Sequence, residues 1–318
     1  MRLACLVFSL ALPLAALAQG FPSRAISIVV PYSPGSTSDL LPRTIAAHLG
    51  QSLGVPVVVE NRPGAGGNIG ATLVAKGDAS GHTVLMAPSA VLATNQWLYK
   101  DPGYDPQKDL TPVIDAATTP NLWVANPSVP VKTMAEVITL AKAKAGSLSF
   151  ASGGAGTTSH LCGELLKTMA QVDLIHVPYK GPAPALQDVL AGRVPLMCDN
   201  FSNVISHVRN GRLRAIALTG VKRITQAPEV PTVSESGLPG FEISVWYGFA
   251  VPAATPKPVV QKLNRAIADA LHQPAVEERL QGLGLSIVAD TPEEFARFVA
   301  AESEKMRRLV RASGAKVE

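Results

Sequence analysis

Short apolar runs alternate with longer segments of helical spacing along most of the chain. The runs predicted as strands cover residues 26–30, 55–60, 83–86, 122–125, 174–177, 196–198 and 213–218. The segments predicted as helices cover residues 39–53, 68–76, 134–145, 159–169 and 184–191. This alternation predicts an α/β fold built on mostly parallel sheets, because parallel strands need a crossover between them.

Two helices near the C-terminus show start signals. Apolar residues recur every four positions over residues 259–271, so we predict Thr255 as the N-cap and Pro256 as the first helical residue. The last helix opens with Thr291, and Glu294 stands where a capping box requires a glutamate.

Two breaks in the alternation divide the chain. Residues 110–124 form a first candidate crossing between halves, and the Pro- and Gly-rich residues 226–240 precede a second. We therefore predict a first lobe of residues 19–120 plus 246–318 and an inserted second lobe of residues 121–245, joined by crossing strands. This topology places a ligand cleft between the lobes and allows hinge closure.

The N-terminus has the make-up of a secretory signal. Arg2 precedes an uncharged apolar stretch at residues 3–17, and residues 16–18 fit a small-x-small cleavage site before Gln19. The stretch is shorter than the roughly 20 residues that span a bilayer, so a membrane anchor is the less favoured alternative. We predict a signal peptide at residues 1–18 and a periplasmic, soluble mature protein without direct membrane insertion.

Composition and charge narrow the class of protein. With 16% charged residues, 47% hydrophobic residues and a net charge of +4, the chain is typical of a globular protein. The one tight basic group, residues 305–308, is expected to be a solvated helix face, so no nucleic-acid partner is predicted. Cys162 and Cys198 remain after signal cleavage, and an even count in an oxidising compartment predicts a disulfide, with two separate buried thiols as the alternative.

Motifs of catalysis and cofactor binding are missing from the sequence. It has no Gly-x-Ser-x-Gly elbow, no Gly-x-x-x-x-Gly-Lys-Ser/Thr loop and no His-Glu-x-x-His, and its six histidines lack metal-ligand spacing. The glycine-rich residues 64–70 miss the dinucleotide spacing, because the third glycine would fall at Ile69. We therefore predict no metal, no cofactor and no enzyme activity.

Residues 31–39 and residues 151–160 carry the strongest functional signal. Each segment follows a predicted strand, is rich in glycine and hydroxyl side chains, and leads into a predicted helix. Backbone N–H groups at a helix N-terminus lack intrahelical partners, so each loop is expected to offer unpaired donors to an anion. Because the loops lie far apart in sequence, one site that uses both would lie between two halves of the molecule.

Further stretches make the chain similar to a known family. With the two loops, residues 57–70, 104–109, 176–181 and 230–241 resemble the periplasmic solute receptors of the tripartite tricarboxylate transporter system, the Bordetella uptake gene (Bug) family. The resemblance implies a two-lobed periplasmic binding protein of type II-like architecture with a small organic acid in the cleft. It also implies delivery of this ligand to the membrane permease subunits of a tripartite transporter, and a monomer is the default expectation.

The resemblance also implies a set of ligand-binding residues, because the family holds a ligand carboxylate with these two loops. Carried over, this indicates Tyr32, Ser36, Ser38 and Asp39 in the first loop and Ser152, Gly154, Thr157, Thr158 and His160 in the second. Asn68, Ser89, Tyr179 and Asp199 complete the predicted set as parts of the cleft wall, with a turn-capping role left open for Asp199. Lys180 is expected to be a solvated charge at the rim.

Three of these residues carry a more specific expectation. The family has a glycine where this chain has Ser36, so a positive φ there would strain the serine by about 1 kcal/mol or more. Asp39 is favoured as an N-terminal cap over a direct ligand, because a carboxylate repels a bound anion. The dipole at the start of its helix should lower the pKa of His160, which favours a neutral imidazole with a structural or a ligand-binding role.

Capture of a carboxylate-bearing metabolite without catalysis is the leading function. A secreted serine hydrolase would use Ser36, Ser38 or Ser159 as nucleophile, and His160 beside Ser159 on one helix turn is a poor base for it. A ligand-reporting partner of a membrane sensor kinase would use the same cleft. No residue of the predicted set selects the far end of the ligand, so the class of acid stays open.

Overall fold

A computed structural model describes residues 20–317 of the chain, except residues 144–145, 147 and 180. The predicted signal peptide at residues 1–18 lies outside these described residues. The strands are β1 (Ile26–Val30), β2 (Val57–Asn61), β3 (Thr83–Pro88), β4 (Leu110–Ala125), β5 (Ser149–Ser152), β6 (Ile175–Pro178), β7 (Leu196–Asn200), β8 (Arg214–Leu218), β9 (Ser244–Pro252) and β10 (Ser286–Ile287).

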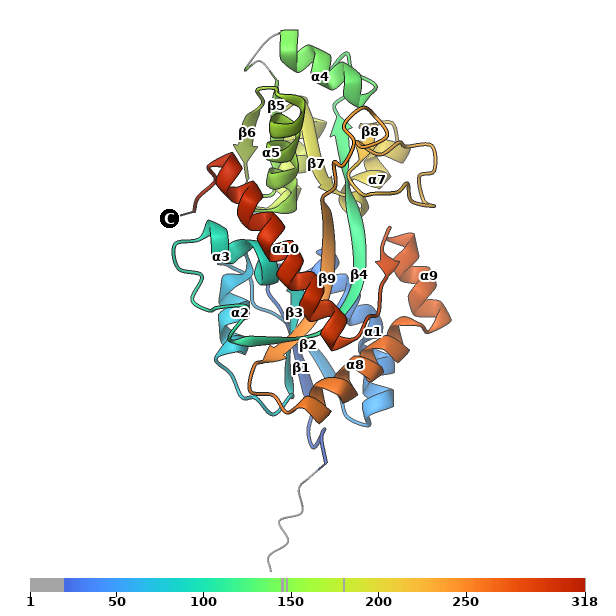
Figure 1. Cartoon of the computed structure of the whole chain (residues 1–318). Helices are drawn as coiled ribbons and strands as arrows, with labels where there is room; N and C mark the ends of the chain where they lie inside the picture. Colours follow the sequence, from blue (N-terminus) through green and yellow to red (C-terminus); the bar gives the residue numbers. More distant parts are fainter. Residues whose placement is uncertain (1–19, 144–145, 147, 180, 318) are drawn as a thin grey trace, which may run out of the picture.

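Helices fill the connections between these strands. They are α1 (Thr37–Leu53), α2 (Asn68–Ala75), α3 (Asn95–Leu98), α4 (Met134–Ala143), α5 (Thr158–Ala170), α6 (Pro182–Leu190), α7 (Phe201–Arg209), α8 (Lys257–Leu271), α9 (Pro274–Gly282) and α10 (Pro292–Ser313), with a 3-10 turn η1 (Ala65–Gly67) and a π-helical turn η2 (Ala90–Thr94). Figure 1 shows the helices packed around one curled sheet that runs the length of the molecule.

The sheet consists of two parallel groups joined by two antiparallel strands. Its order is β2-β1-β3-β9-β4-β7-β5-β6, and β8 and β10 each pair with β4. Strands β2, β1 and β3 are mutually parallel, as are β7, β5 and β6, whereas β9 and β4 run antiparallel to each other and to their outer neighbours. The predicted α/β class with mostly parallel sheets is therefore confirmed.

Strand β4 connects the two groups. Its residues 110–120 pair with β9, and its residues 121–125 pair with β7 and β8, so the change of partner falls between Pro120 and Asn121. Strand β9 begins at Ser244, opposite Pro120, and returns the chain to the first group. The lobe boundaries at residues 120/121 and 245/246 stay a prediction, although both lie next to this crossing.

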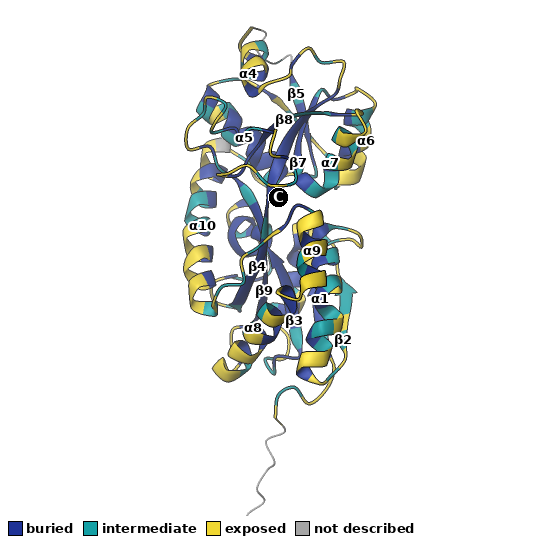
Figure 2. Cartoon of the chain, turned by 90° about the vertical axis from the view of Figure 1, so that its right-hand side faces the viewer, coloured by how far each residue is buried: buried dark blue, intermediate teal, exposed yellow. Residues whose placement is uncertain are grey.

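The apolar core differs between the two faces of the sheet. One cluster of buried residues runs through both halves and includes Leu92, Trp246 and Phe295 together with Trp123 and Phe150. On the other face one cluster packs α1 and α8 in the first half and a separate cluster packs α6 and α7 in the second. Figure 2 shows α10 along one side of the sheet, with α1 and α7 toward the other. The two halves thus share a core under α10 but not on the side of α1 and α7.

The C-terminal helix signals are confirmed in one case and shifted in the other. Thr291 caps α10 in a capping box with Glu294, as predicted. The prediction for α8 is wrong by one residue: Pro256 is the N-cap, and the helix begins at Lys257. Helices α7 and α9, each nine residues long, were not predicted.

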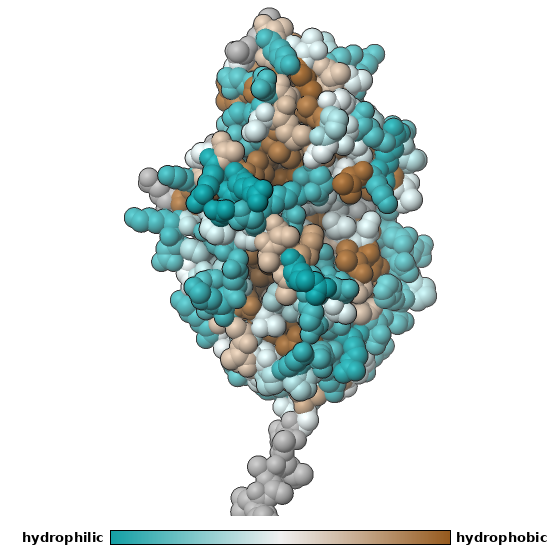
Figure 3. All heavy atoms as spheres, in the orientation of Figure 1, coloured by the Kyte–Doolittle hydropathy of each residue, from teal (hydrophilic) through white to brown (hydrophobic). Residues whose placement is uncertain are grey.

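Among the described residues, no helix has both the length and the apolar character that a bilayer crossing requires. On the face shown in Figure 3, hydrophobic residues form separate patches among hydrophilic ones.

The predicted disulfide is confirmed, since Cys162 in α5 is bonded to Cys198 in β7. The bond closes a loop between residues 36 positions apart, and chain-entropy arguments assign such a loop roughly 3 to 4 kcal/mol of stability. We expect the double variant Cys162→Ala/Cys198→Ala to lose about this free energy of unfolding, measured by urea denaturation. Reductant should produce a similar loss in the native protein and none in the variant. If the native protein has the same free energy of unfolding with and without reductant, this prediction is wrong.

Candidate functional site

The loop after β1 turns sharply before α1 begins. Gly35 adopts φ +81°, and Ser36, the N-cap of α1, has φ −70° and ψ 160°. The strain considered for Ser36 is therefore absent, because the positive φ falls one residue earlier, on a glycine. The Ser36 hydroxyl donates to the Ser33 carbonyl at 2.9 Å, so it stabilises the turn itself.

Asp39 lies in the first turn of α1 and not at the N-cap position that we predicted. Its buried carboxylate accepts the Gly35 N–H, Asn61 Nδ2 and Arg43 Nε, each at 2.9 Å. Burial raises the pKa of Asp39, but these hydrogen bonds and the Arg43 charge outweigh burial and lower it. The ionised carboxylate thus holds the loop in place, and Arg43 compensates its charge.

A hydrogen-bond network ties the first loop to the glycine-rich segment before α2. Tyr32 Oη donates to the Gly66 carbonyl at 3.1 Å, and Asn95 Nδ2 lies 3.0 Å from the same carbonyl and 2.6 Å from Asn68 Oδ1. Asn68 is buried, and within the described part of the chain its Nδ2 has no hydrogen-bond partner. Tyr32 and Asn68 therefore belong to one connected wall.

The loop after β5 bonds much of its own backbone. Ser152 Oγ accepts the Gly154 N–H at 3.1 Å, His160 Nδ1 accepts the Gly156 N–H at 3.0 Å, and Thr157, the N-cap of α5, accepts the His160 N–H at 3.3 Å. The expectation of unpaired donors is therefore too broad, because these N–H groups already have partners inside the loop. By helix geometry, the N–H groups of Thr158 and Ser159 at the start of α5 lack intrahelical acceptors.

Two imidazoles stack beside this loop. The rings of His160 and His176 lie 3.9 Å apart with 12° between their planes, and Phe150 also stacks on His176 at 5.0 Å. His176 Nε2 lies 2.6 Å from Ser152 Oγ. Burial, the neighbouring His176 and Lys167 lower the pKa of His160 to about 3, and burial and Lys167 lower the pKa of His176 to about 4. Both rings are neutral at pH 7, and burial is the main cause.

A third helix start, which the sequence reading missed, joins the two loops. The Thr37 and Ser202 hydroxyls lie 3.0 Å apart, which links the first turns of α1 and α7. Ser159 donates its hydroxyl to the Cys198 carbonyl, which links α5 to the strand that leads into α7. Asn200, the N-cap of α7, donates from Nδ2 to Tyr247 Oη at 3.0 Å. The signal in the sequence was an asparagine after a strand, followed by apolar residues at helical spacing.

The remaining predicted residues fall in different places. Ser89 is buried at the start of η2. Tyr179 donates its hydroxyl to Asp188 Oδ2 at 2.7 Å, which ties it to α6. Asp199 is buried and accepts the Asn200 N–H at 2.8 Å and Asn203 Nδ2 at 3.1 Å, while burial raises its pKa to about 6. These bonds match the turn-capping role left open for Asp199. Lys180 lies outside the described residues.

Two of the three hydroxyls considered as nucleophiles, those of Ser36 and Ser159, donate to backbone carbonyls and not to a base. Ser36 donates to the Ser33 carbonyl and Ser159 to the Cys198 carbonyl, and His160 Nδ1 is occupied by the Gly156 N–H. Within residues 20–317 where the chain is described, no cluster of three or more His, Cys, Asp or Glu side chains could hold a metal ion.

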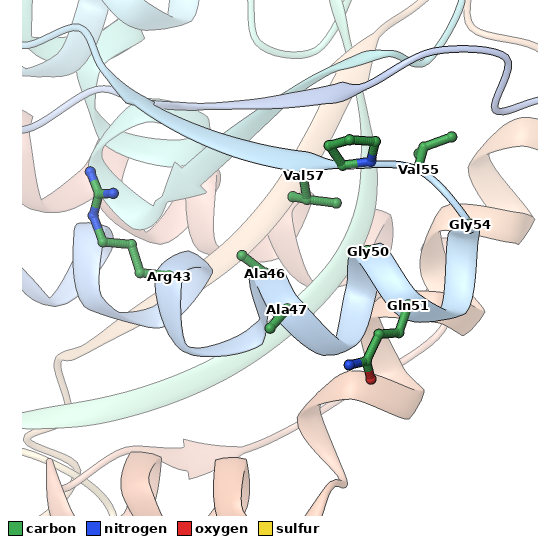
Figure 4. A pocket seen from close by; sticks show the side chains of 9 residues that line it. Arg43, Ala46, Ala47, Gly50, Gln51, Gly54, Val55 and Val57 are labelled. Atoms are coloured by element: carbon green, nitrogen blue, oxygen red, sulfur yellow. The ribbon is translucent and has the colours of Figure 1, made fainter.

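Two cavities open on the surface of the first half. A groove of about 630 Å³ lies between α1 and β2, and Figure 4 shows its small side chains, with Arg43 at one end and Gly54 and Val55 at the other. A second cavity of about 330 Å³ is lined by Asn68, Ile69 and Tyr99 among others. Neither contains residues of the loop after β5, so neither is the space between the two loops.

The fold and the convergence of loops from both halves define a two-lobed solute-binding protein of the periplasmic class. The chain belongs to the tripartite tricarboxylate transporter family of receptors (TctC), whose family model matches residues 41–315. It is 38% identical to Protein BugT of Bordetella pertussis over 304 residues, which cover 95% of this chain and 93% of that protein. The family is one of receptors, and its relative BugD is a periplasmic binding protein.

Solved structures share the fold along nearly the whole chain. The R. palustris protein Rpa4515 with adipate has 36% identity and a TM-score of 0.87, covering 93% of this chain and all of that one. MatC from Rhodopseudomonas palustris with bound malate has 34% identity and a TM-score of 0.83, covering 91% and 100%. The periplasmic binding protein BugD has 35% identity and a TM-score of 0.84, covering 94% and 100%.

The histidine pair predicts a pH-dependent contribution to stability. The folded pKa of His176 is about 4 against an ordinary 6.5, so between these values the unfolded state binds more protons. The contribution of neutral His176 is therefore complete above pH 6.5 and declines as the pH falls toward 4. We expect the difference in unfolding free energy between the native protein and His176→Phe to fall by up to about 1.4 kcal/mol per pH unit as the pH is lowered from 6 to 4, measured by urea denaturation.

This comparison needs a variant because buried carboxyl groups titrate in the opposite direction. Burial raises the pKa of Asp115 to about 8 and that of Asp290 to about 6, and these contributions cancel in the difference between two variants. His272→Gln, at the exposed end of α8, is the matched control and should leave the pH profile unchanged. A His176→Phe profile parallel to the native one would refute the assignment.

Proposed function

We propose that this chain captures a small carboxylate-bearing metabolite between two lobes, residues 19–120 plus 246–318 and residues 121–245, and delivers it to the permease subunits of a tripartite transporter. The observation that carries the proposal is the meeting of three helix N-termini: α1 contacts α7 through Thr37 and Ser202, and α5 contacts the end of β7 through Ser159. The adipate and malate held by two structural relatives support a carboxylate as the ligand.

Helix N-termini can hold such an anion without an arginine ligand. A partly buried anion at a helix N-terminus gains up to about 2 kcal/mol from the dipole, and a charged hydrogen bond adds about 1.5 to 3 kcal/mol. The first-turn N–H groups of α1 and α5 and the hydroxyls of Ser38 and Thr158 are the donors that we assign to the carboxylate. Asp39 does not oppose binding, because Arg43, Asn61 and Gly35 already saturate its carboxylate.

The other predicted residues receive supporting roles in this proposal. Ser36, Ser152, Gly154, Thr157 and His160 fix the two loops through the bonds described above. Tyr32, Asn68 and Ser89 form the wall in the first lobe, and Tyr179 and Asp199 form the wall in the second. The mature protein acts in the periplasm as a monomer after removal of residues 1–18.

A thermal-shift screen tests the function directly. The mature protein, refolded to remove carried-over ligand, is scanned against mono-, di- and tricarboxylates, amino acids and aromatic acids. An acid at 100 times its Kd should add about 2.7 kcal/mol of stability and raise Tm by several degrees, and calorimetry on hits gives Kd. Neutral amides of the same acids are the matched controls and should give no shift. If no acid in the panel raises Tm, the proposal is wrong.

Neighbouring threonines separate binding from stability in the second loop. Thr158→Ala removes a donor that we assign to the ligand, so Kd for the best acid should rise at least severalfold with little change in Tm. Thr157→Ala removes the N-cap of α5, whose Oγ1 accepts the His160 N–H, and should cost about 1 kcal/mol of stability. Calorimetry and urea denaturation measure the two effects. If Thr158→Ala binds the acid with an unchanged Kd, the Thr158 hydroxyl is not a ligand contact.

A further inference from the structure

A disulfide connects two of the helix starts that form the proposed site. Cys162 lies in the second turn of α5, and its partner Cys198 lies in β7, two residues before Asn200, the N-cap of α7. Both cysteines are fully buried in the apolar cluster under α10. The bond is therefore an internal link between α5 and the strand that leads directly into α7.

A hydrogen bond joins α5 to the same residue of β7. Ser159, in the first turn of α5, donates its buried hydroxyl to the Cys198 carbonyl. Residues 159 and 162 are three positions apart, so their side chains lie on the same face of the helix. Cys198 thus holds one face of the start of α5 at two points, through its side chain and through its backbone.

The ladder between β5 and β7 ends before it reaches these contacts. Its last pair is Ala151 with Met197, and the loop that leads into α5 begins soon after Ala151. Cys198 stands opposite Trp123 in the β4–β7 ladder, so its position follows the register of β4. The two contacts of Cys198 therefore fix the start of α5 relative to β4 where the direct pairing of β5 with β7 no longer does.

The segment after Cys198 also contacts the first half. Ser202, in the first turn of α7, has its hydroxyl 3.0 Å from that of Thr37 in α1. Donors on α1 and α5 can share one carboxylate only if each lies within about 2.7 to 3.2 Å of one of its oxygen atoms. A displacement of about 1 Å at the start of α5 would therefore break hydrogen bonds to the ligand. The position of α5 relative to the end of β7 thus decides whether both helices can bind the same anion.

We propose that the disulfide between Cys162 and Cys198, together with the hydrogen bond of Ser159, positions the N-terminus of α5 for the ligand, so that affinity as well as stability depends on it. This inference rests on the proposed function, because it takes the first-turn N–H groups of α5 as ligand donors. The three residues contact no ligand in this proposal and act through α5, so they are positioning residues. Loss of the disulfide leaves the Ser159 hydrogen bond as the remaining contact of Cys198 with α5 that is described above.

Calorimetry with the best acid from the thermal-shift screen tests this role. Kd should rise by about threefold or more in Cys162→Ala/Cys198→Ala, and by about tenfold or more when Ser159→Ala is added, because the helix start is then less well ordered before binding. Native protein refolded under reductant keeps both sulfur atoms but lacks the bond, so its Kd should match that of the double variant, and reoxidation should restore the native Kd. If Kd is unchanged in the triple variant, or rises in the alanine variants but not in the reduced protein, the proposal is wrong.

Met134→Ala is the matched control for lost stability. Met134 begins α4 at the end of the second half that lies away from α1 (Figure 1), and it is fully buried in the same apolar cluster as both cysteines. Its truncation should lower the free energy of unfolding by an amount comparable with loss of the disulfide and should leave Kd unchanged. An equal rise of Kd in Met134→Ala would make the effect one of general destabilisation and overturn the proposal.

Hydrogen exchange measured by mass spectrometry gives a second readout that needs no ligand. Amides in peptides covering residues 153–161 should exchange faster in Cys162→Ala/Cys198→Ala than in Met134→Ala, whereas amides of α1 should exchange equally in the two variants. Equal exchange of residues 153–161 in both variants would overturn the positioning role of the disulfide. Faster exchange there, together with a screen without hits, would reject the proposed function and leave the role of the disulfide in holding α5 supported.

Discussion

The hydrogen-bond ladder of β4, which continues along the strand through three register shifts, is the constraint on which the rest of the structure depends. This strand pairs with β9 in one half and with β7 and β8 in the other, so it fixes the position of both parallel groups with one stretch of backbone. Because side chains alternate between faces, a slip of one residue would move every side chain of β4 to the wrong face. The placement of Asn121 opposite Asn200, and hence the meeting of α7 with α1, follows from this register.

The two loops owe their shape to polar groups that act on the loops themselves. Asp39, Ser152 and His160 each accept a backbone N–H of their own loop, so these side chains hold the helix starts in position before any ligand arrives. Such preorganisation reduces the ordering cost of binding. It also explains why a loop rich in candidate donors directs few of them toward a ligand. Most of these donors form hydrogen bonds inside the loop, and the proposed function assigns the N–H groups in the first turn of α1 and α5 to the anion.

The alternating fold could be predicted from periodicity and local breakers, and the even cysteine count favoured the disulfide over two separate thiols, an alternative that the structure then excluded. The loops after β1 and β5 could be located for the same reason. The contacts inside them could not, since the partner of Ser159 is the Cys198 carbonyl and the partner of Thr37 is Ser202, each far away in sequence. The strain that a positive φ would have caused at Ser36 does not arise, because Gly35 supplies the left-handed residue of the turn.

The balance between the two sides of the sheet links the fold to the proposed closure. The apolar cluster under α10 contains residues of both halves, and its burial favours contact between the halves on the side of α10. If the side of α1 and α7 were equally apolar, the halves would remain closed, and a ligand could neither enter nor control the state. Polar contacts between hydroxyls and amides contribute little net stability in water, about 0.5 to 1.5 kcal/mol each. In the proposed function, polar contacts on the side of α1 and α7 and a shared apolar core under α10 would keep the free energy of closure small enough for one bound acid to change the state.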